Sequence, residues 1–247
     1  MDPWFEAGWY LKNQPLVVRG RVHLGEVAMK SANYNPVWDL PTRIFHWCLL
    51  PGIGFMWWTG ETGRMEWHSY CAYGLICLVV SRIVWGFIGS YHARFFHFLV
   101  GPKRIIQYIR EPGEVTGHNP LGALSTIALL GLLLAQGLSG LFSVDDASFE
   151  GPLAYVADGD FIDTATEWHE VNWSLLQAFI ALHLLAIAFY QFKRRQRLIQ
   201  VMWYGSSETR QGAEPAKSSL LALVVLAAAA GCLWLAIAMA PEPPRWY

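Results

Sequence analysis

The amino-acid sequence predicts an all-α membrane protein, in which a four-helix transmembrane bundle is followed by a fifth, C-terminal transmembrane helix. Composition is the first observation behind this fold class. Of the 247 residues 54% are hydrophobic and 15% are charged, and the mean hydropathy is +0.27, whereas a soluble domain carries about 25% charged residues. The second observation is a set of five apolar segments, each close to the ~20 residues that a helix needs to cross a bilayer.

These segments divide the chain into three parts. Residues 1–36 contain no segment long enough to cross a bilayer and no signal-peptide pattern, so we expect an N-terminal extension outside the membrane. Residues 37–200 contain the four-helix bundle. Residues 201–247 contain a linker and the fifth helix.

The first span is expected over about residues 42–59. Asp39 is a candidate N-cap in front of it, and Pro41 suits the first turn of a helix. Pro51 should bend or loosen this helix, which membrane helices tolerate where their neighbours satisfy the backbone.

The other spans are expected over about residues 67–88, 120–142, 168–190 and 220–240. The second has His68 at its beginning and Arg82 well inside. Glycines in the third leave room for close packing between helices. The fourth carries two histidines, and the fifth is rich in Ala and Leu, with the Cys232 thiol as its titratable group.

Charged residues in the connections predict the orientation. The second-to-third connection carries Arg94, Lys103, Arg104 and Arg110. The fourth-to-fifth connection carries Lys193, Arg194, Arg195, Arg197, Arg210 and Lys217. The connection over residues 143–167 has no Lys or Arg, and its acidic residues are Asp145, Asp146, Glu150, Asp158, Asp160, Asp163 and Glu167. By the positive-inside rule the two basic connections, the 201–220 linker and the N-terminal extension are cytoplasmic, and the C-terminus lies outside.

Four histidines fall into two pairs by depth. His169 and His183 are 14 residues apart, which on an α-helix is a rise of roughly 21 Å and about 40° short of four turns, so they lie on nearly one face. In the predicted orientation His46 and His183 lie toward the cytoplasmic side, and His68 and His169 lie toward the outer side. Because facing helices build the cofactor sites of four-helix bundles, we interpret the two pairs as axial ligands of two stacked haems.

These histidines have two alternatives to haem ligation. A lone histidine on an apolar face is more often structural than a ligand, but two pairs at matching depths favour ligation. A proton relay also uses intramembrane histidines, although it would normally add buried carboxylates, and the spans contain almost none. Iron with two axial histidines has no open position, so we expect it to carry single electrons rather than to activate dioxygen.

The cysteines indicate neither a disulfide framework nor covalently attached haem. The chain has four of them, and they form no C-x-x-C pair and no C-x-x-C-H motif.

Two arginines are candidate partners for the anionic propionates of the haem on the cytoplasmic side. Arg43 precedes His46 by three residues and therefore lies on a neighbouring part of the same face. Arg82 lies inside its span, where an unpaired charge would be costly. The alternative for Arg82 is a side chain that extends to lipid phosphate. Arg64, in the short outer connection, is a weaker candidate for the outer haem.

Three motifs carry a resemblance to a known family. They are VWDLPTRIFHW at residues 37–47, WGFIGSYHARF at residues 85–95 and GHNPLGA at residues 117–123. With the His169/His183 spacing they resemble the bacterial di-haem cytochrome b family, which contains cytochrome b561 and the b-type subunits of nickel–iron hydrogenases. The resemblance covers about residues 37–200. It implies a multi-pass protein of the bacterial inner membrane, with two haem b groups ligated by the pairs His46/His183 and His68/His169.

A further polar group falls at the cytoplasmic ends of the second and third spans. It consists of His92, Arg94, His118 and Asn119. Polar groups at the mouth of an apolar pocket orient ligands, so these residues are candidates for a quinone head-group site or for propionate binding. The alternative is that they cap helix ends and organise the loop, which is the role we expect for His97.

The resulting hypothesis is electron transfer across the inner membrane between the quinone pool and a periplasmic partner, such as a c-type cytochrome. The acidic outer connection either follows from topology or steers a basic partner. Three other classes remain open: the membrane-anchoring cytochrome b of a hydrogenase or dehydrogenase complex, a stand-alone enzyme such as a superoxide:quinone oxidoreductase, and a non-redox transporter or scaffold. Membrane lipid is an expected partner, and the sequence does not decide whether the protein is a homodimer. The net charge of −1 does not favour binding to nucleic acid.

Overall fold

The computed structural model describes residues 35–113, 115–145, 149–207 and 211–241. The chain divides into two units, residues 1–34 and residues 35–247, so nearly all of the predicted N-terminal extension lies outside the described residues, as do Asp146 and Arg210. The regular elements of the described residues are helices, and an isolated antiparallel bridge joins Val144 to Glu150. This confirms the all-α fold class for the part of the chain that is described.

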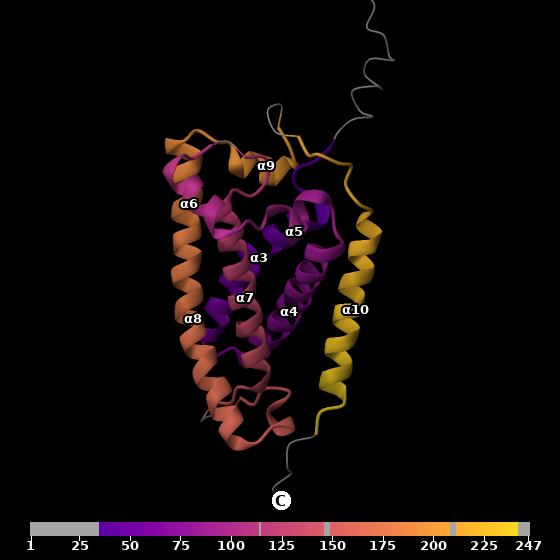
Figure 1. The fold of residues 1–247 in the computed structure, drawn as a ribbon. Coiled ribbons are helices and arrows are strands. Elements are labelled where there is room, and N and C mark those ends of the chain that lie inside the picture. The colour runs from indigo at the N-terminus through magenta and orange to yellow at the C-terminus, as the bar shows by residue number, and fades with distance from the viewer. Residues whose placement is uncertain (1–34, 114, 146–148, 208–210, 242–247) are drawn as a thin grey trace, which may run out of the picture. The chain divides into compact units, whose positions relative to one another are not determined.

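Five long helices form the second unit (Figure 1). They are α3 (Leu40–Glu61), α4 (Met65–Ile88), α7 (Pro120–Phe142), α8 (Gly159–Ala188) and α10 (Ser219–Ala238). The connections contain the shorter elements η1 (Tyr91–Ala93), α5 (Phe95–Phe98), α6 (Pro102–Arg110), η2 (Ala154–Val156), η3 (Phe189–Lys193) and α9 (Leu198–Tyr204).

Four of the described helices are long and apolar enough to cross a membrane. They are Met65–Ile88, Pro120–Phe142, Gly159–Lys193 and Ser219–Ala238. The first expected span lies in α3, which is a helix of 22 residues but does not belong to these four. Arg43, His46 and several tryptophans lower its mean hydropathy. The expected number of five spans is therefore not confirmed, although the chain has the apolar helices of a multi-pass membrane protein.

Helix α8 begins at Gly159, well before the expected start at Trp168. The Asp158 side chain accepts a hydrogen bond from the Phe161 N–H (2.9 Å), and Asp160 lies in the first turn. An N-cap aspartate and a further acidic residue both stabilise a helix N-terminus. Part of the acidic segment that was expected to be a loop is therefore the first turns of α8.

The long helices pack as neighbours in a bundle. α7 packs against α8 and α4, and α4 also packs against α3 and α10 (Figure 1). Gly137 of α7 lies so close to α4 that a Cβ atom there would come within 2.5 Å of Ile76, which agrees with the close packing expected from the glycines of this helix. α10 has no buried residue and packs on the outside of α4.

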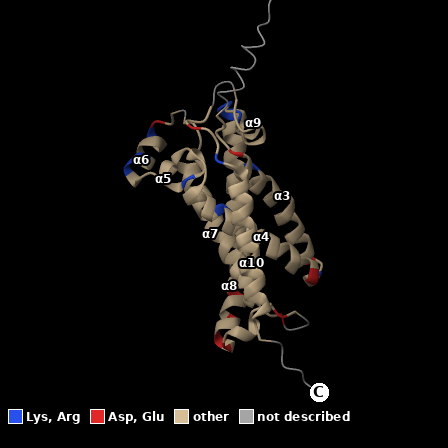
Figure 2. Ribbon diagram, turned by 90° about the vertical axis from the view of Figure 1, so that its right-hand side faces the viewer, with Lys and Arg blue, Asp and Glu red and all other residues tan. Residues whose placement is uncertain are grey.

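Charge differs between the two ends of the bundle (Figure 2). Lys and Arg gather on α6 and near α9, whereas Asp and Glu mark the beginning of α8 and the end of α3. α3, α7 and α10 start at the basic end, and α4 and α8 start at the acidic end (Figure 1). His46 and His183 consequently lie toward the basic end, and His68 and His169 lie toward the acidic end.

Asp39 connects the beginning of α3 to the interior of the bundle. One carboxylate oxygen accepts a hydrogen bond from the Thr42 N–H (3.0 Å) and so caps α3, and the other accepts from the Trp85 indole of α4 (2.8 Å). Only 2% of Asp39 is exposed, and its charge attracts the buried guanidinium of Arg82. The sequence indicates the cap but not these two contacts with α4.

We therefore expect Asp39→Ala to lower the free energy of unfolding by about 2–4 kcal/mol, because it removes an N-cap and leaves buried donors without an acceptor. The measurement is thermal or denaturant unfolding of the detergent-solubilised protein. Asp158→Ala is the matched control, since Asp158 is an exposed N-cap with no second buried partner, and it should cost only about 1 kcal/mol. Equal losses in the two variants would contradict the double role of Asp39.

Candidate functional site

His68 and His169 line one cavity at the acidic end of the bundle. The cavity has a volume of about 330 Å³ and lies among α3, α4, α7 and α8. Most of its walls are apolar side chains and glycines, among them Met56, Trp57, Gly60, Ile76, Leu133, Gly137 and Gly140. The structure thus brings together the two histidines that the sequence assigns to the outer side.

Backbone carbonyl groups orient both of these imidazoles. The Nδ1 atom of His68 lies 3.1 Å from the Met56 carbonyl oxygen, and the Nδ1 atom of His169 lies 3.0 Å from the Gln136 carbonyl oxygen. A carbonyl oxygen can only accept, so each Nδ1 carries the hydrogen and each Nε2 keeps its lone pair. This is the arrangement found in metal-binding histidines, whose second nitrogen is fixed by a carbonyl or carboxylate.

Glycines leave space beside both rings. A Cβ atom at Gly140 would come within 2.7 Å of His169 Cε1, which is closer than real Cβ contacts allow. A Cβ atom at Gly60 would lie 3.5 Å from His68 Cε1. The absence of side chains at these positions keeps the space next to the imidazoles open.

His46 and His183 face each other at the basic end. Their ring centroids are 6.5 Å apart, with an interplanar angle of 55°. Two imidazoles that bind one metal from opposite sides need metal–nitrogen bonds of ~2 Å each, which with the two ring radii gives a centroid separation of roughly 6 Å. The spacing of His46 and His183 therefore fits a shared metal between them.

The donor sets fit a haem rather than a bare metal ion. In the described residues no group of three or more His, Cys, Asp and Glu side chains could hold a metal ion. Each pair instead offers two imidazoles, and the cavity at His68 and His169 has mostly apolar walls. Such a site suits an iron whose remaining ligands come from a porphyrin.

The basic end also contains a group of buried polar atoms without hydrogen-bond partners. They are Thr42 Oγ1, Arg43 Nε, His46 Nδ1, Arg94 Nε and His118 Nδ1. Buried polar atoms are normally paired, so each exception in a native protein needs an explanation, such as a bound group or a water molecule. Three of them come from the first turns of α3 beside His46, where a polar or anionic group could satisfy them.

The two arginines predicted to bind propionates both lie at this end. The Arg43 Nη2 group donates to the Trp203 carbonyl oxygen, and its Nε atom is free. Arg82 is only 4% exposed and donates to the Ala93 carbonyl oxygen (3.4 Å), with its guanidinium 5.6 Å from the Phe95 ring centroid. Arg82 is thus held inside the protein, and the alternative in which it extends to lipid phosphate does not describe its position.

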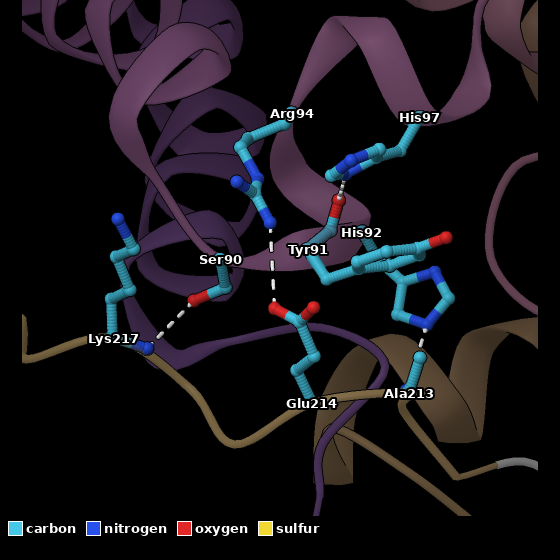
Figure 3. A network of polar contacts seen from close by, with 8 residues as sticks. All are labelled: Ser90, Tyr91, His92, Arg94, His97, Ala213, Glu214 and Lys217. Atoms are coloured by element: carbon cyan, nitrogen blue, oxygen red, sulfur yellow. Dashed lines mark hydrogen bonds and ion pairs between the residues drawn. The ribbon is translucent and has the colours of Figure 1, made fainter.

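His92 and Arg94 contact the segment that leads to α10 (Figure 3). The Ala213 N–H donates to His92 Nε2 (3.3 Å), and Arg94 forms an ion pair with Glu214 (3.4 Å). Close by, the Lys217 N–H donates to the Ser90 hydroxyl (2.9 Å). These contacts match the loop-organising role that the sequence left open, and the quinone or propionate role of His92 and Arg94 stays a prediction.

His118 and Asn119 have different surroundings although they are adjacent. Asn119 Oδ1 accepts a hydrogen bond from the Gly122 N–H (2.7 Å) and caps α7. The His118 ring lies between Trp38 and Phe98, at centroid distances of 4.6 and 4.4 Å. Burial, together with the positive charge of Arg82, lowers the pKa of His118 to about 3. His118 is therefore a neutral imidazole with a free Nδ1 near the inner pair.

Sequence reasoning missed a polar cluster around His169. The Gln136 amide donates to the His169 carbonyl oxygen (3.0 Å), and the Asn172 amide donates to Gln136 Oε1 (2.6 Å). The Ser139 hydroxyl lies 3.1 Å from His169 Nδ1. The available signal was the presence of uncharged amide side chains inside apolar spans, since such groups hydrogen-bond between neighbouring helices.

Comparison with known proteins identifies the family. The sequence matches the prokaryotic cytochrome b561 family over residues 37–205. A probable Ni/Fe-hydrogenase B-type cytochrome subunit of Azotobacter chroococcum mcd 1 is 25% identical over 220 residues, which cover 72% of this chain and 89% of the relative. The protein of the same name from Bradyrhizobium diazoefficiens is 23% identical over 215 residues, covering 70% and 86%. No solved structure gives a significant match.

The family match spans most of the chain and includes all four paired histidines. It agrees with the resemblance carried by the three sequence motifs. The chain belongs to the prokaryotic cytochrome b561 family and is a multi-pass membrane cytochrome b, with b-type haem, that takes part in electron transfer.

Proposed function

We propose that this cytochrome holds two b-type haems at different depths and passes electrons across the bacterial inner membrane, between the quinone pool and a periplasmic redox partner. The observation that supports this most directly is the placement of the histidines: His46 and His183 face each other at one end of the bundle, and His68 and His169 line one cavity at the other. His46 and His183 are the proposed ligands on the cytoplasmic side, and His68 and His169 are those on the periplasmic side. A haem iron bound by two histidines supplies one-electron chemistry.

The residues of the chain have distinct tasks in this proposal. The Met56 and Gln136 carbonyl groups hold His68 and His169 in the tautomer that keeps a lone pair on Nε2, and such a contact raises the basicity of a metal ligand. The Gln136 amide lies 3.2 Å from His169 Nε2 and would have to turn away for that atom to bind iron. Arg43 and Arg82 place positive charge beside the inner pair, where anionic propionates in a low dielectric need cationic partners. His118 offers a further polar atom at the same end, for a propionate or for a quinone head group.

The orientation belongs to the proposal as well. The basic end, with α6 and α9, is placed in the cytoplasm, and the acidic end is placed in the periplasm, as the positive-inside rule requires. A c-type cytochrome with a lysine-rich surface is the proposed partner, because it would complement the acidic residues at the beginning of α8.

A second candidate function is favoured by the relatives. The similar proteins are named as subunits of Ni/Fe hydrogenases, so this chain could receive electrons as the membrane subunit of a hydrogenase or related dehydrogenase complex. Purification from native membranes under mild conditions separates the two candidates. Co-purification of an iron–sulfur subunit supports the complex, and an isolated cytochrome that reduces c-type cytochrome supports the first function.

The histidine pairs predict which substitution removes which haem. His68→Ala and His169→Ala should each remove the outer haem and keep the inner one, and His46→Ala and His183→Ala should do the reverse, because each haem needs both ligands. The pyridine haemochrome assay should show a loss of about half of the haem content in each variant. His97→Ala is the control, since His97 is exposed, contacts the Tyr91 carbonyl oxygen and belongs to neither histidine pair. A variant that loses the haem at the opposite end would contradict the pairing.

Gly140 should be needed for the outer haem. In Gly140→Ala the new Cβ atom would displace the His169 imidazole, so the outer haem should be lost or its absorption band shifted, while the inner haem stays. Gly131→Ala is a matched control in the same helix, because nothing lies within 4 Å of a Cβ atom there. Reduced-minus-oxidised spectra at low temperature resolve the two haems. Full and unshifted haem in Gly140→Ala would show that this space is not used.

If the acidic end steers a basic cytochrome, the bimolecular rate should fall as salt rises, since the Debye length shortens from about 8 Å at 0.15 M to about 3 Å at 1 M. Asp160, Asp163 and Glu167 are exposed on α8, and neutralising all three as Asn, Asn and Gln should slow the reaction at low salt by roughly tenfold. Stopped-flow mixing with a lysine-rich c-type cytochrome measures both effects.

Glu111→Gln at the basic end is the control. A rate independent of salt would leave membrane topology as the explanation of the acidic residues.

A further inference from the structure

Helix α6 is amphipathic and exposes both of its faces. Lys103, Arg104 and Arg110 are exposed on its polar side. On the apolar side Tyr108 is buried against the bundle, but Ile106 and Ile109 remain 51% and 59% exposed. A helical projection places these two isoleucines next to Lys103 and Arg110, so α6 has a boundary between exposed apolar and exposed cationic side chains.

α6 lies beside α7 and beside η3, which continues α8 (Figure 1). The hydroxyl groups of Tyr108 and Tyr190 lie 3.1 Å apart, and Arg194 Nη2 donates to the Pro112 carbonyl oxygen (3.2 Å). These contacts bring together two basic segments that are far apart in the sequence. Their exposed cations are Lys103, Arg104, Arg110, Lys193, Arg194 and Arg195, and we call them the α6 basic surface.

The charge of this surface is not neutralised within the described part of the chain. The ion pair of the described residues joins Arg94 to Glu214. None of the six cations of the α6 basic surface takes part in an ion pair with a described residue. A cavity of about 300 Å³ on α6 is lined by Lys103, Ile106, Gln107, Arg110 and Glu111, so one carboxylate lies beside the two cations. Membrane topology accounts for the sign of these charges and for the exposure of Phe192, which lies in the candidate span Gly159–Lys193, but not for the exposed isoleucines of α6.

We propose that the α6 basic surface binds the phosphate groups of anionic phospholipids in the leaflet on its side of the membrane, with Ile106, Ile109 and Phe192 against the acyl chains. α6 lies in the connection between the two candidate spans α4 and α7, which keeps it close to the membrane boundary. Short amphipathic helices rich in Lys and Arg lie in that boundary, and basic sites beside transmembrane helices on the cytoplasmic side bind anionic head groups. The proposal requires the membrane assignment alone and does not depend on the number of haems.

The test compares lipid binding by the haem-loaded wild type and by Lys103→Gln/Arg110→Gln. Detergent-purified protein is titrated with phosphatidylglycerol or with phosphatidylcholine, and native mass spectrometry counts the lipids that stay bound. The wild type should prefer phosphatidylglycerol. Each cation removed should weaken its binding about fivefold, whereas phosphatidylcholine binding should not change. Lys217→Gln, an exposed cation on the segment before α10, is the control and should bind like the wild type.

Two further arms decide the nature of the ligand. Ile106→Ser/Ile109→Ser keeps all cations and should also weaken phosphatidylglycerol binding, because the acyl chains lose their contacts. Millimolar inorganic phosphate should not displace the lipid. Equal binding of the two lipids by the wild type, an unchanged affinity in the Gln variant, or displacement by inorganic phosphate would each overturn the proposal. An unchanged haem spectrum in both variants keeps this result separate from the proposed electron transfer.

Discussion

An imidazole that is to bind iron in an apolar bundle must keep a lone pair on one nitrogen, and the hydrogen bonds of His68 and His169 agree with this constraint. In a low dielectric the free tautomer has to be fixed by a hydrogen bond to the other nitrogen. In this protein the acceptors are main-chain carbonyl groups of Met56 in α3 and Gln136 in α7. A helix carbonyl near the end of a helix or beside a polar side chain can accept such an additional bond. The Thr59, Ser139 and Gln136 side chains also lie within hydrogen-bond distance of the two imidazoles. They give the rings polar but uncharged surroundings.

The basic end is built from a different set of groups. No hydrogen bond fixes the tautomer of His46, whose Nδ1 has no partner, and Thr42 Oγ1 and Arg43 Nε in the same helix are also unpaired. Asp39 is the buried carboxylate of this region, and it is already engaged by Thr42 and by Trp85. The positive charge of Arg82 and Arg43 is thus only partly balanced within the protein. An anionic group between these side chains would complete the balance, as the propionates of a haem bound by His46 and His183 would in the proposed function.

The sequence predicted the long apolar helices because apolar length is a local property, and the assignment of the paired histidines as haem ligands stays a prediction. Apolar length defines α4, α7, α8 and α10, and the 14-residue spacing of His169 and His183 places them on one face of a continuous helix. Boundaries were less accurate where capping decided them, as at Asp158. The contacts of Asp39 with α4, and the network of Gln136 and Asn172, depend on which helices become neighbours. The spacing of residues within one segment does not indicate which other helix will pack against it.

Charge at the basic end bears on both the orientation of the protein in the membrane and the redox potential of a bound group. Cations outside the membrane favour the orientation in which the connections of α6 and α9 stay in the cytoplasm. In the proposed function, a cation beside His46 and His183 would favour the reduced, less positive form of the group they hold, so Arg43 and Arg82 would act in the same direction on its potential. Acidic residues near His68 and His169 would act in the opposite direction, although water screens them more strongly because they are exposed. The buried Arg82 should therefore change the difference in potential between the two ends more than any one exposed carboxylate does.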